Sequence, residues 1–154
     1  DRRERIETLR KIAKAVNSDK TMIFINTKYD LEESLQKLQY HNYNVAALAG
    51  NIDKQSKKKA VEDFQNGRLQ YLLATDVAAR GLQIDHVSTV INVNLPEKPT
   101  EYLHRAGRCG RNNEQGLCIS IITENELNKI KKYQKAFNIN IVQKRLYNGK
   151  IVSK

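Results

Sequence analysis

The feature that most constrains the fold is a regular alternation of short apolar runs with longer segments of helical periodicity. Short apolar runs bounded by polar or turn residues are typical of buried β-strands. Between the runs, apolar residues recur three and four positions apart, as on the buried face of a helix. This alternation predicts an α/β fold, a parallel sheet with helices on both faces. The expected strands span residues 22–25, 45–48, 71–74, 89–93 and 117–122.

Polar residues set the boundaries of the expected helices. Thr27 and Asp53 each precede an apolar stripe and are suited to cap its first turn. Thr123 with Glu126 has the spacing of a capping box. Pro99 fits the first turn of a helix, because its missing N–H has no helical partner there.

The two ends of the chain give weaker patterns. We expect a leading helix within residues 1–19 and an edge strand over the alternating residues 139–142. We expect residues 143–154 to fray. No repeat or low-complexity linker divides the chain, so residues 1–154 are expected to form one domain.

Charge and cysteine content narrow the class of protein. The chain has 27 Lys and Arg against 17 Asp and Glu, a net charge of +10, which favours a polyanionic partner without choosing RNA, DNA or an acidic protein. Two cysteines imply no disulfide framework, and no His or Cys pair has zinc-finger spacing. No membrane-spanning stretch or signal peptide is present, and the missing initiator Met suggests an excised fragment.

Residues 104–111, His-Arg-Ala-Gly-Arg-Cys-Gly-Arg, carry the clearest chemical pattern. Arg105, Arg108 and Arg111 are three residues apart, with Gly107 and Gly110 between them. Arginine offers a planar, always charged fork of donors that matches phosphate oxygens, and glycine lets a bulky anion approach the backbone. The motif therefore indicates polyphosphate binding, although a solvated basic loop is the alternative for such a cluster taken alone.

A second pattern lies about thirty residues upstream. Thr75 and Asp76 directly follow the apolar run 71–74, at the carboxyl end of an expected parallel strand. Open α/β sheets bind their ligands at that edge. The alternative is that both residues only cap the following turn.

Together these two stretches resemble motifs V and VI of the DEAD-box RNA helicases. The family pattern for motif V is close to A-T-D-V-A-A-R-G-L-D, and that for motif VI is close to H-R-x-G-R-x-G-R; DEAH-type and RecQ-type helicases differ at these motifs. Residues 23–28 resemble motif IV, Gln55 to Lys58 occupies the place of the Q-x-x-R element, and residues 91–96 with Tyr102 resemble the stretch between motifs V and VI. The resemblance covers roughly residues 20–123 and implies the second RecA-like domain of a helicase.

The resemblance implies a nucleotide site shared with an absent N-terminal domain. Arg108 and Arg111 are then arginine fingers toward ATP, and His104 couples the nucleotide to the domain interface. Magnesium accompanies the nucleotide and is expected on the N-terminal domain, so no metal ligand is assigned here. The implied nucleotide-contacting residues are Gly81, Gln83, Asp85, Arg108 and Arg111.

The resemblance also implies sequence-independent RNA binding through the phosphate and sugar backbone. No aromatic cluster of the kind that stacks bases is evident, and Tyr40 and Tyr43 are expected to pack. The implied RNA contacts are Thr27, Gly50, Asn51, Lys58 and Thr75, and the implied supporting residues are Gln55, Asp76, Arg80 and Arg105. Asp76 and Arg80 are expected to link motif V to motif VI.

Two residues depart from the family pattern. Gln83 replaces the acidic residue that ends motif V and reaches the ATP ribose, although Asp85 lies two positions on. Lys58 replaces an arginine and so loses the bidentate fork. Both changes leave open a degenerate, non-catalytic scaffold for RNA or protein, while the form of motifs V and VI disfavours a DNA-directed motor.

The chain alone is not expected to hydrolyse ATP. It has neither the G-x-x-x-x-G-K-[ST] phosphate loop nor an Asp-Glu-Ala-Asp element. From the family resemblance we expect an intracellular protein whose partners are RNA and its own N-terminal domain, with no membrane contact and a monomeric isolated domain. The compartment, the target RNA and any protein cofactor are left open by the sequence.

Overall fold

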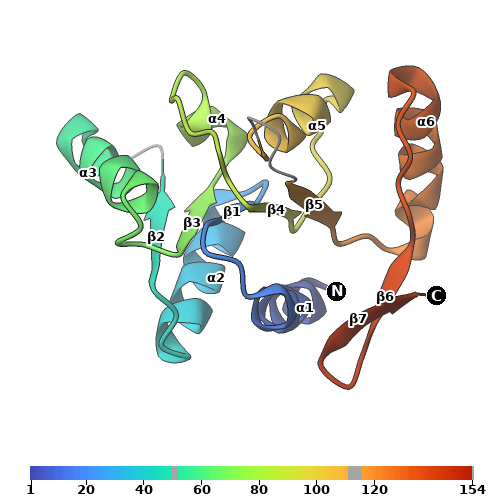
Figure 1. The fold of residues 1–154 in the computed structure, drawn as a ribbon, viewed down its shortest axis with the longest axis horizontal. Coiled ribbons are helices and arrows are strands. Elements are labelled where there is room, and N and C mark those ends of the chain that lie inside the picture. The colour runs from blue at the N-terminus through green and yellow to red at the C-terminus, as the bar shows by residue number, and fades with distance from the viewer. Residues whose placement is uncertain (50–51, 111–115, 154) are drawn as a thin grey trace.

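A five-stranded parallel sheet forms the centre of the computed structural model, which describes residues 1–49, 52–110 and 116–153 (Figure 1). The strand order is β2-β3-β1-β4-β5, and every neighbouring pair is parallel. The strands are β1 (Thr21–Phe24), β2 (Val45–Leu48), β3 (Tyr71–Ala74), β4 (Thr89–Asn92) and β5 (Leu117–Ser120). All five predicted strands are confirmed, and the fold is the α/β class that the alternation predicts.

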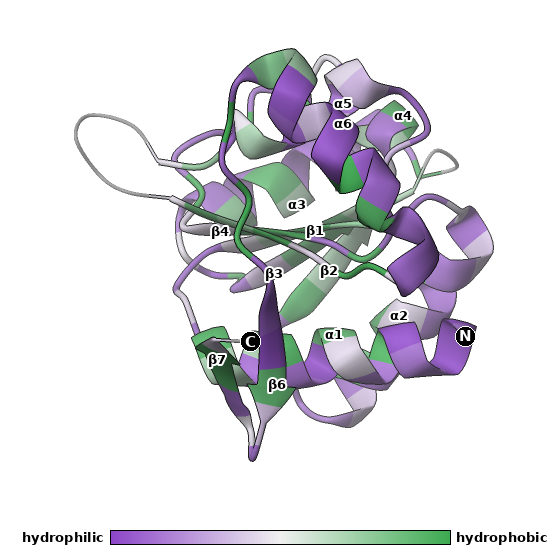
Figure 2. Cartoon of the chain, turned by 90° about the vertical axis from the view of Figure 1, so that its right-hand side faces the viewer, coloured by the Kyte–Doolittle hydropathy of each residue, from purple (hydrophilic) through white to green (hydrophobic). Residues whose placement is uncertain are grey.

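Helices cover both faces of this sheet. In Figures 1 and 2, α1 and α2 lie on one face, and α3, α4 and α5 lie on the other. The helices are α1 (Arg2–Val16), α2 (Lys28–Tyr40), α3 (Lys54–Gln65), α4 (Asp76–Ala79), α5 (Pro99–Ala106) and α6 (Leu127–Phe137), with a 3-10 turn, η1 (Glu124–Glu126), before α6. No helix among the described residues is long and apolar enough to cross a membrane.

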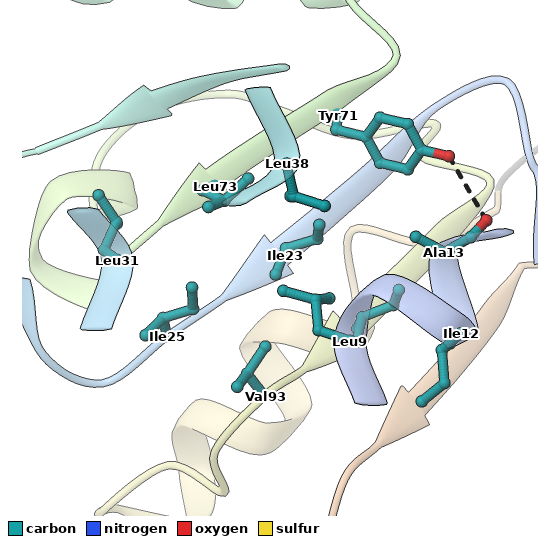
Figure 3. Packing of buried hydrophobic residues seen from close by; sticks show 11 residues of the cluster. Leu9, Ile12, Ala13, Ile23, Ile25, Leu31, Leu38, Tyr71, Leu73 and Val93 are labelled. Atoms are coloured by element: carbon teal, nitrogen blue, oxygen red, sulfur yellow. Dashed lines mark hydrogen bonds between the residues drawn. The ribbon is translucent and has the colours of Figure 1, made fainter. Parts of the chain in front are cut away.

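The core consists of two layers because successive strand residues point to opposite faces. Ile23 packs with Leu9 and Leu31 beneath α1 and α2, as Figure 3 shows. Phe24 packs on the other side with Phe64 of α3. Central strands β1, β3 and β4 are buried at every position, which explains their apolar sequences.

The predicted helix caps are confirmed. Thr27 accepts a hydrogen bond from the Asp30 amide at 3.2 Å, and Asp53 accepts one from Ser56 at 2.7 Å. Pro99 occupies the first turn of α5. The capping box of Thr123 and Glu126 is present, but it starts η1 and not α6 itself.

The C-terminal end differs from the prediction. Residues 143–154 were expected to fray, yet β6 (Lys144–Tyr147) and β7 (Lys150–Ser153) form an antiparallel hairpin. Its turn is Asn148-Gly149, with φ of 50° and 75°, an arrangement that favours a two-residue hairpin turn. Leu146 packs against the core beneath α1, which holds the hairpin to the domain.

The edge strand expected over residues 139–142 is also wrong. These residues form no strand. Ile139 and Ile141 pack instead against a small cluster that contains Ile130 and Tyr133 of α6. Side-chain burial, and not strand pairing, therefore explains the alternation of apolar residues. These residues attach the segment after α6 to the domain.

Candidate functional site

The carboxyl ends of the parallel strands meet at one edge of the sheet. In the strand register, Ala74 of β3 pairs with Phe24 of β1, which also pairs with Asn92 of β4. Thr75 and Asp76 therefore emerge beside Asn26, which follows β1. This edge is where open α/β sheets bind ligands.

Arg105 of α5 joins these strand ends. Its side chain is 1% exposed, and it donates from Nε to Asp76 Oδ1 at 2.8 Å and from Nη2 to Asp76 Oδ2 at 2.7 Å. Further hydrogen bonds reach Asn26 Oδ1 (2.9 Å), Asn94 O (2.8 Å) and Asn92 Oδ1 (3.3 Å). A buried arginine needs such a full set of acceptors, because an unpaired charge would be costly in the core.

Arg108 lies nearby but has a different environment. It is half-buried and donates at 3.2 Å to the carbonyl oxygens of Ala79, the last residue of α4, and of Leu82 and Ile84 in the loop that follows. Burial lowers the pKa of its guanidinium from the ordinary value. Among the described residues, carbonyl oxygens accept its hydrogen bonds and no carboxylate forms a salt bridge with it, while the charges of Asp76, Asp85 and Glu101 favour its charged form.

A pocket of about 300 Å³ opens between α4 and α5. Its lining residues are Phe24, Asp76, Ala79, Arg80, Gly81, Glu101, His104, Arg105 and Arg108. The side chains of His104 and Arg80 are 71% and 66% exposed, and both lie near Glu101, at 3.6 Å and 3.5 Å. The pocket thus has a basic, solvent-accessible rim, and its lining includes the buried Arg105 and its half-buried partner Asp76.

Asp76 links motif V to motif VI directly, through its pair with Arg105. Arg80 pairs with Glu101, three residues before motif VI, and Glu101 in turn lies 3.6 Å from His104 of that motif. Sequence reasoning assigned no role to Asn26, Asn92 or Glu101. Asn26 and Asn92 had a recognisable signal, since each is a polar residue at the end of an apolar strand.

The other implied nucleotide contacts lie on the loop after α4. Gly81 has φ of +81°, a left-handed conformation that favours glycine, and it lines the pocket. Gln83 is exposed, and Asp85 is half-buried with its Oδ1 3.7 Å from His86 Nε2. The loop therefore places Gly81 at the pocket and Gln83 two residues further along.

The implied RNA contacts are distributed over the helix starts and α3. Thr27 is exposed and caps α2, while Thr75 is half-buried and caps α4, with its Oγ1 3.2 Å from the Ala78 amide. Each cap uses only the hydroxyl oxygen, and among the described residues neither hydroxyl donates a hydrogen bond, so both protons can be donated to an acceptor. Gln55 and Lys58 are exposed on α3. The remaining predicted site residues, Gly50, Asn51 and Arg111, lie outside the described residues.

Metal and thiol chemistry receive no support from the described part of the chain. Within it, no group of three or more His, Cys, Asp or Glu side chains is placed to hold a metal ion. Cys109 and Cys118 are free thiols. Burial raises their pKa to about 12 and about 11, so neither forms a thiolate at neutral pH.

Comparison with known proteins decides the family. The protein family described as "Helicase conserved C-terminal domain" matches residues 4–113 of this chain. The structure of the C-terminal domain of the DEAD-box protein Dbp5 superposes with a TM-score of 0.82 at 31% identity, over 89% of this chain and 81% of that one. The chain belongs to the DEAD-box helicase C-terminal domains. The RecA-like fold implied by its motifs is thereby confirmed.

Other relatives are consistent with this membership. The DEAD-box protein SrmB of E. coli, bound to regulator of ribonuclease activity A, has a TM-score of 0.80 at 28% identity, over 88% of this chain and 80% of that one. The DEAD-box ATP-dependent RNA helicase CshC of Bacillus cereus is 34% identical over 99% of this chain and 39% of its own length. This helicase domain spans 39%, 25% and 34% of the first three curated relatives.

Proposed function

We propose that this domain is the second RecA-like half of an ATP-dependent RNA helicase. The observation that carries the proposal is the Arg105–Asp76 pair, which fixes motif VI against motif V at the ligand edge of the sheet. Two relatives support the proposal. CshC is named an ATP-dependent RNA helicase, and Dbp5 of S. cerevisiae has a structure bound to RNA and ADP BeF3. ATP and RNA bind across a cleft between this domain and an N-terminal domain.

Arg108 and Arg111 are the proposed arginine fingers. Phosphoryl transfer depends on positioning and on stabilising the charge of the transferring group, which a cross-domain arginine supplies. Among the described residues, the hydrogen bonds of Arg108 go to carbonyl oxygens, so it can exchange these neutral acceptors for an anionic phosphate. Arg105 is not such a finger, because its donors are saturated inside the domain.

The pocket rim supplies the remaining nucleotide contacts in this proposal. His104 couples the nucleotide to the N-terminal domain, and Gly81, Gln83 and Asp85 approach the ribose. Magnesium bound to ATP is held by the N-terminal domain. On its own this domain does not hydrolyse ATP, because it has no phosphate loop.

RNA occupies the other side of the cleft. Thr27, Thr75 and Lys58, with Gly50 and Asn51 assigned from the motifs, contact phosphates and sugars without reading bases. Closure of the two domains holds one strand in a shape that a duplex cannot keep, so short duplexes separate locally. Hydrolysis and phosphate release reopen the cleft.

The test is ATP turnover by the full-length protein with no nucleic acid, with single-stranded RNA and with single-stranded DNA. We expect RNA to stimulate hydrolysis strongly, DNA to stimulate it weakly, and the isolated domain to show no turnover. Equal stimulation by DNA would indicate a DNA-directed motor. RNA binding without any turnover by folded protein would favour the non-catalytic scaffold.

A further inference from the structure

The positive charge of this chain is concentrated at its C-terminal end. Residues 1–126 contain 19 Lys and Arg against 17 Asp and Glu, so they are nearly neutral. Residues 127–154 contain 8 Lys and Arg and no Asp or Glu, which accounts for +8 of the net charge of +10. A surface that is charged only for solubility normally mixes both signs, and this segment does not.

The structure places these cations on one side of the domain. Four exposed lysines lie on α6, and three exposed cations lie on the β6–β7 hairpin. Both elements are on the side that faces the viewer in Figure 2. Among the described residues, none of the seven forms an ion pair with a carboxylate. They are Lys129, Lys131, Lys132, Lys135, Lys144, Arg145 and Lys150.

The hairpin adds an exposed aromatic ring between two of these cations. The Tyr147 side chain is 57% exposed, which is unusual for an aromatic residue in a strand. The Arg145 guanidinium lies 5.3 Å from the centre of its ring, and Lys150 is its cross-strand partner. The hairpin is attached to the core through Leu146, so Tyr147 is not needed for packing there.

Cations beside an exposed aromatic ring suit a single-stranded nucleic acid. The cations neutralise phosphates, and a base stacks on the ring or on the arginine plane. A membrane surface would require a continuous apolar face beside the cations. Tyr147 and Ile151 are the exposed large apolar residues of the hairpin strands, and their exposed neighbours are Lys144, Arg145, Asn148, Gly149, Lys150 and Ser153. An acidic protein would leave the tyrosine–arginine pair unexplained.

We infer that α6 and the β6–β7 hairpin form a second RNA-binding surface, which holds the single-stranded RNA that extends beyond the cleft. The inference rests on the proposed function, because RNA in the cleft supplies the strand. Its role is to raise affinity for long RNA through a second, linked contact. A short oligonucleotide that fills only the cleft gains nothing from it.

The test measures affinity of the full-length protein, with a non-hydrolysable ATP analogue, for oligouridylates of about 10 and about 40 nucleotides. We expect Arg145→Gln/Lys150→Gln to weaken binding of the long RNA at least fivefold and to change binding of the short RNA less than twofold. The salt dependence of long-RNA affinity should fall by about 1.4 in its log–log slope, since each single-strand phosphate contact contributes about 0.7.

Control variants separate the effect of this surface from the effect of lowering the net charge of the protein. Lys59→Gln/Arg68→Gln removes the same charge from α3 and the loop after it, on the opposite side in Figure 1, and should leave both affinities within twofold. Tyr147→Leu should weaken long-RNA binding several-fold while Tyr147→Phe retains it. Lys129→Gln/Lys132→Gln on α6 provides a second test that leaves the hairpin intact.

Three results would overturn the inference. They are unchanged long-RNA affinity in the hairpin and α6 variants, an equal loss for short and long RNA, and an equal loss in the α3 control. If the unsubstituted protein binds neither RNA, the proposed function fails instead, and the two failures are thereby distinguished.

Discussion

Arg105 organises the candidate site through contacts within the domain. Five hydrogen bonds link it to Asp76, Asn26, Asn92 and the Asn94 carbonyl, and it lies 5.0 Å from the centre of the Phe24 ring. Only a planar guanidinium can satisfy acceptors in these directions at once. Its role is therefore to set the relative positions of three strand ends.

We predict that Arg105→Lys destabilises the domain by about 2–4 kcal/mol, because lysine leaves buried acceptors and part of the Asp76 charge unpaired. Urea unfolding measures the change. Arg80→Lys is the matched control, since Arg80 is 66% exposed and its pair with Glu101 is solvent-screened. If both variants lose only about 1 kcal/mol or less of unfolding free energy, Arg105 does not hold the three strand ends in place.

Gln83 provides a second prediction at the residue scale. Gln83→Asp should tighten ATP binding to the full-length protein several-fold, because a carboxylate binds a ribose hydroxyl about 1 kcal/mol more strongly than an amide. Titration with a fluorescent ATP analogue measures it. No tightening would show that this exposed side chain does not reach the ribose.

At the scale of elements, α1 is an integral layer of the domain. Leu9, Ile12 and Ala13 are buried against the sheet. Arg5 donates to the carbonyls of Val93 and Ile121, at 2.6 Å and 3.1 Å. These contacts attach α1 to the ends of β4 and β5, so the helix and the sheet are expected to unfold together.

The ion pairs of α1 give a pH prediction. Arg10, and then Lys37 of α2, lower the pKa of Glu7 to about 2 from an ordinary value of 4.5. A lowered pKa stabilises the fold above pH 4.5, and this stability is lost as the pH falls toward 2. Glu7→Gln should cost about 1 kcal/mol or less at pH 7 and less as the pH falls toward 2.

Urea midpoints between pH 7 and pH 2 measure this effect. Glu32→Gln, on the exposed side of α2, is the control and should lose no pH-dependent stability. A constant difference between Glu7→Gln and the unsubstituted protein across this pH range would mean that the ion pairs do not stabilise the helix contact.

The elements show where sequence reasoning succeeds. Strands and caps were predicted because each depends on local patterns, such as the apolar run before Thr75 or the hydroxyl of Thr27. The C-terminal hairpin was missed although Asn148-Gly149 is a strong turn signal, because its strands are too polar to read as buried. Of the two tyrosines expected to pack, Tyr43 packs against the core, whereas Tyr40, the last residue of α2, is 83% exposed.

The site was only partly predictable. Motifs V and VI identified Asp76 and Arg105 as site residues. They did not predict that these two residues pair, or that Asn26 and Asn92 are the other side-chain acceptors of Arg105. That information depends on the register of β1, β3 and β4, which joins residues far apart in sequence. Similarly, the motif indicated Arg108 but not its carbonyl partners.

At the scale of the whole molecule, nucleotide binding and the inferred binding of long RNA are assigned to two different surfaces. The carboxyl edge of the sheet holds the pocket with Arg105 and Arg108, while α6 and the β6–β7 hairpin hold most of the net charge. In the proposed function, an N-terminal domain completes the first surface. The second surface is inferred to bind RNA that leaves the cleft, so substitutions there should affect long substrates and not the chemistry of hydrolysis.

The most direct test of the account is the RNA-stimulated kcat of the full-length protein carrying Arg108→Ala, beside Arg68→Ala as a surface control. We predict that kcat falls by about 10³-fold or more in Arg108→Ala, with little change in RNA affinity, and that Arg68→Ala matches the unsubstituted protein. A normal kcat in Arg108→Ala, in protein that melts at the usual temperature, would contradict the assignment of motif VI to ATP.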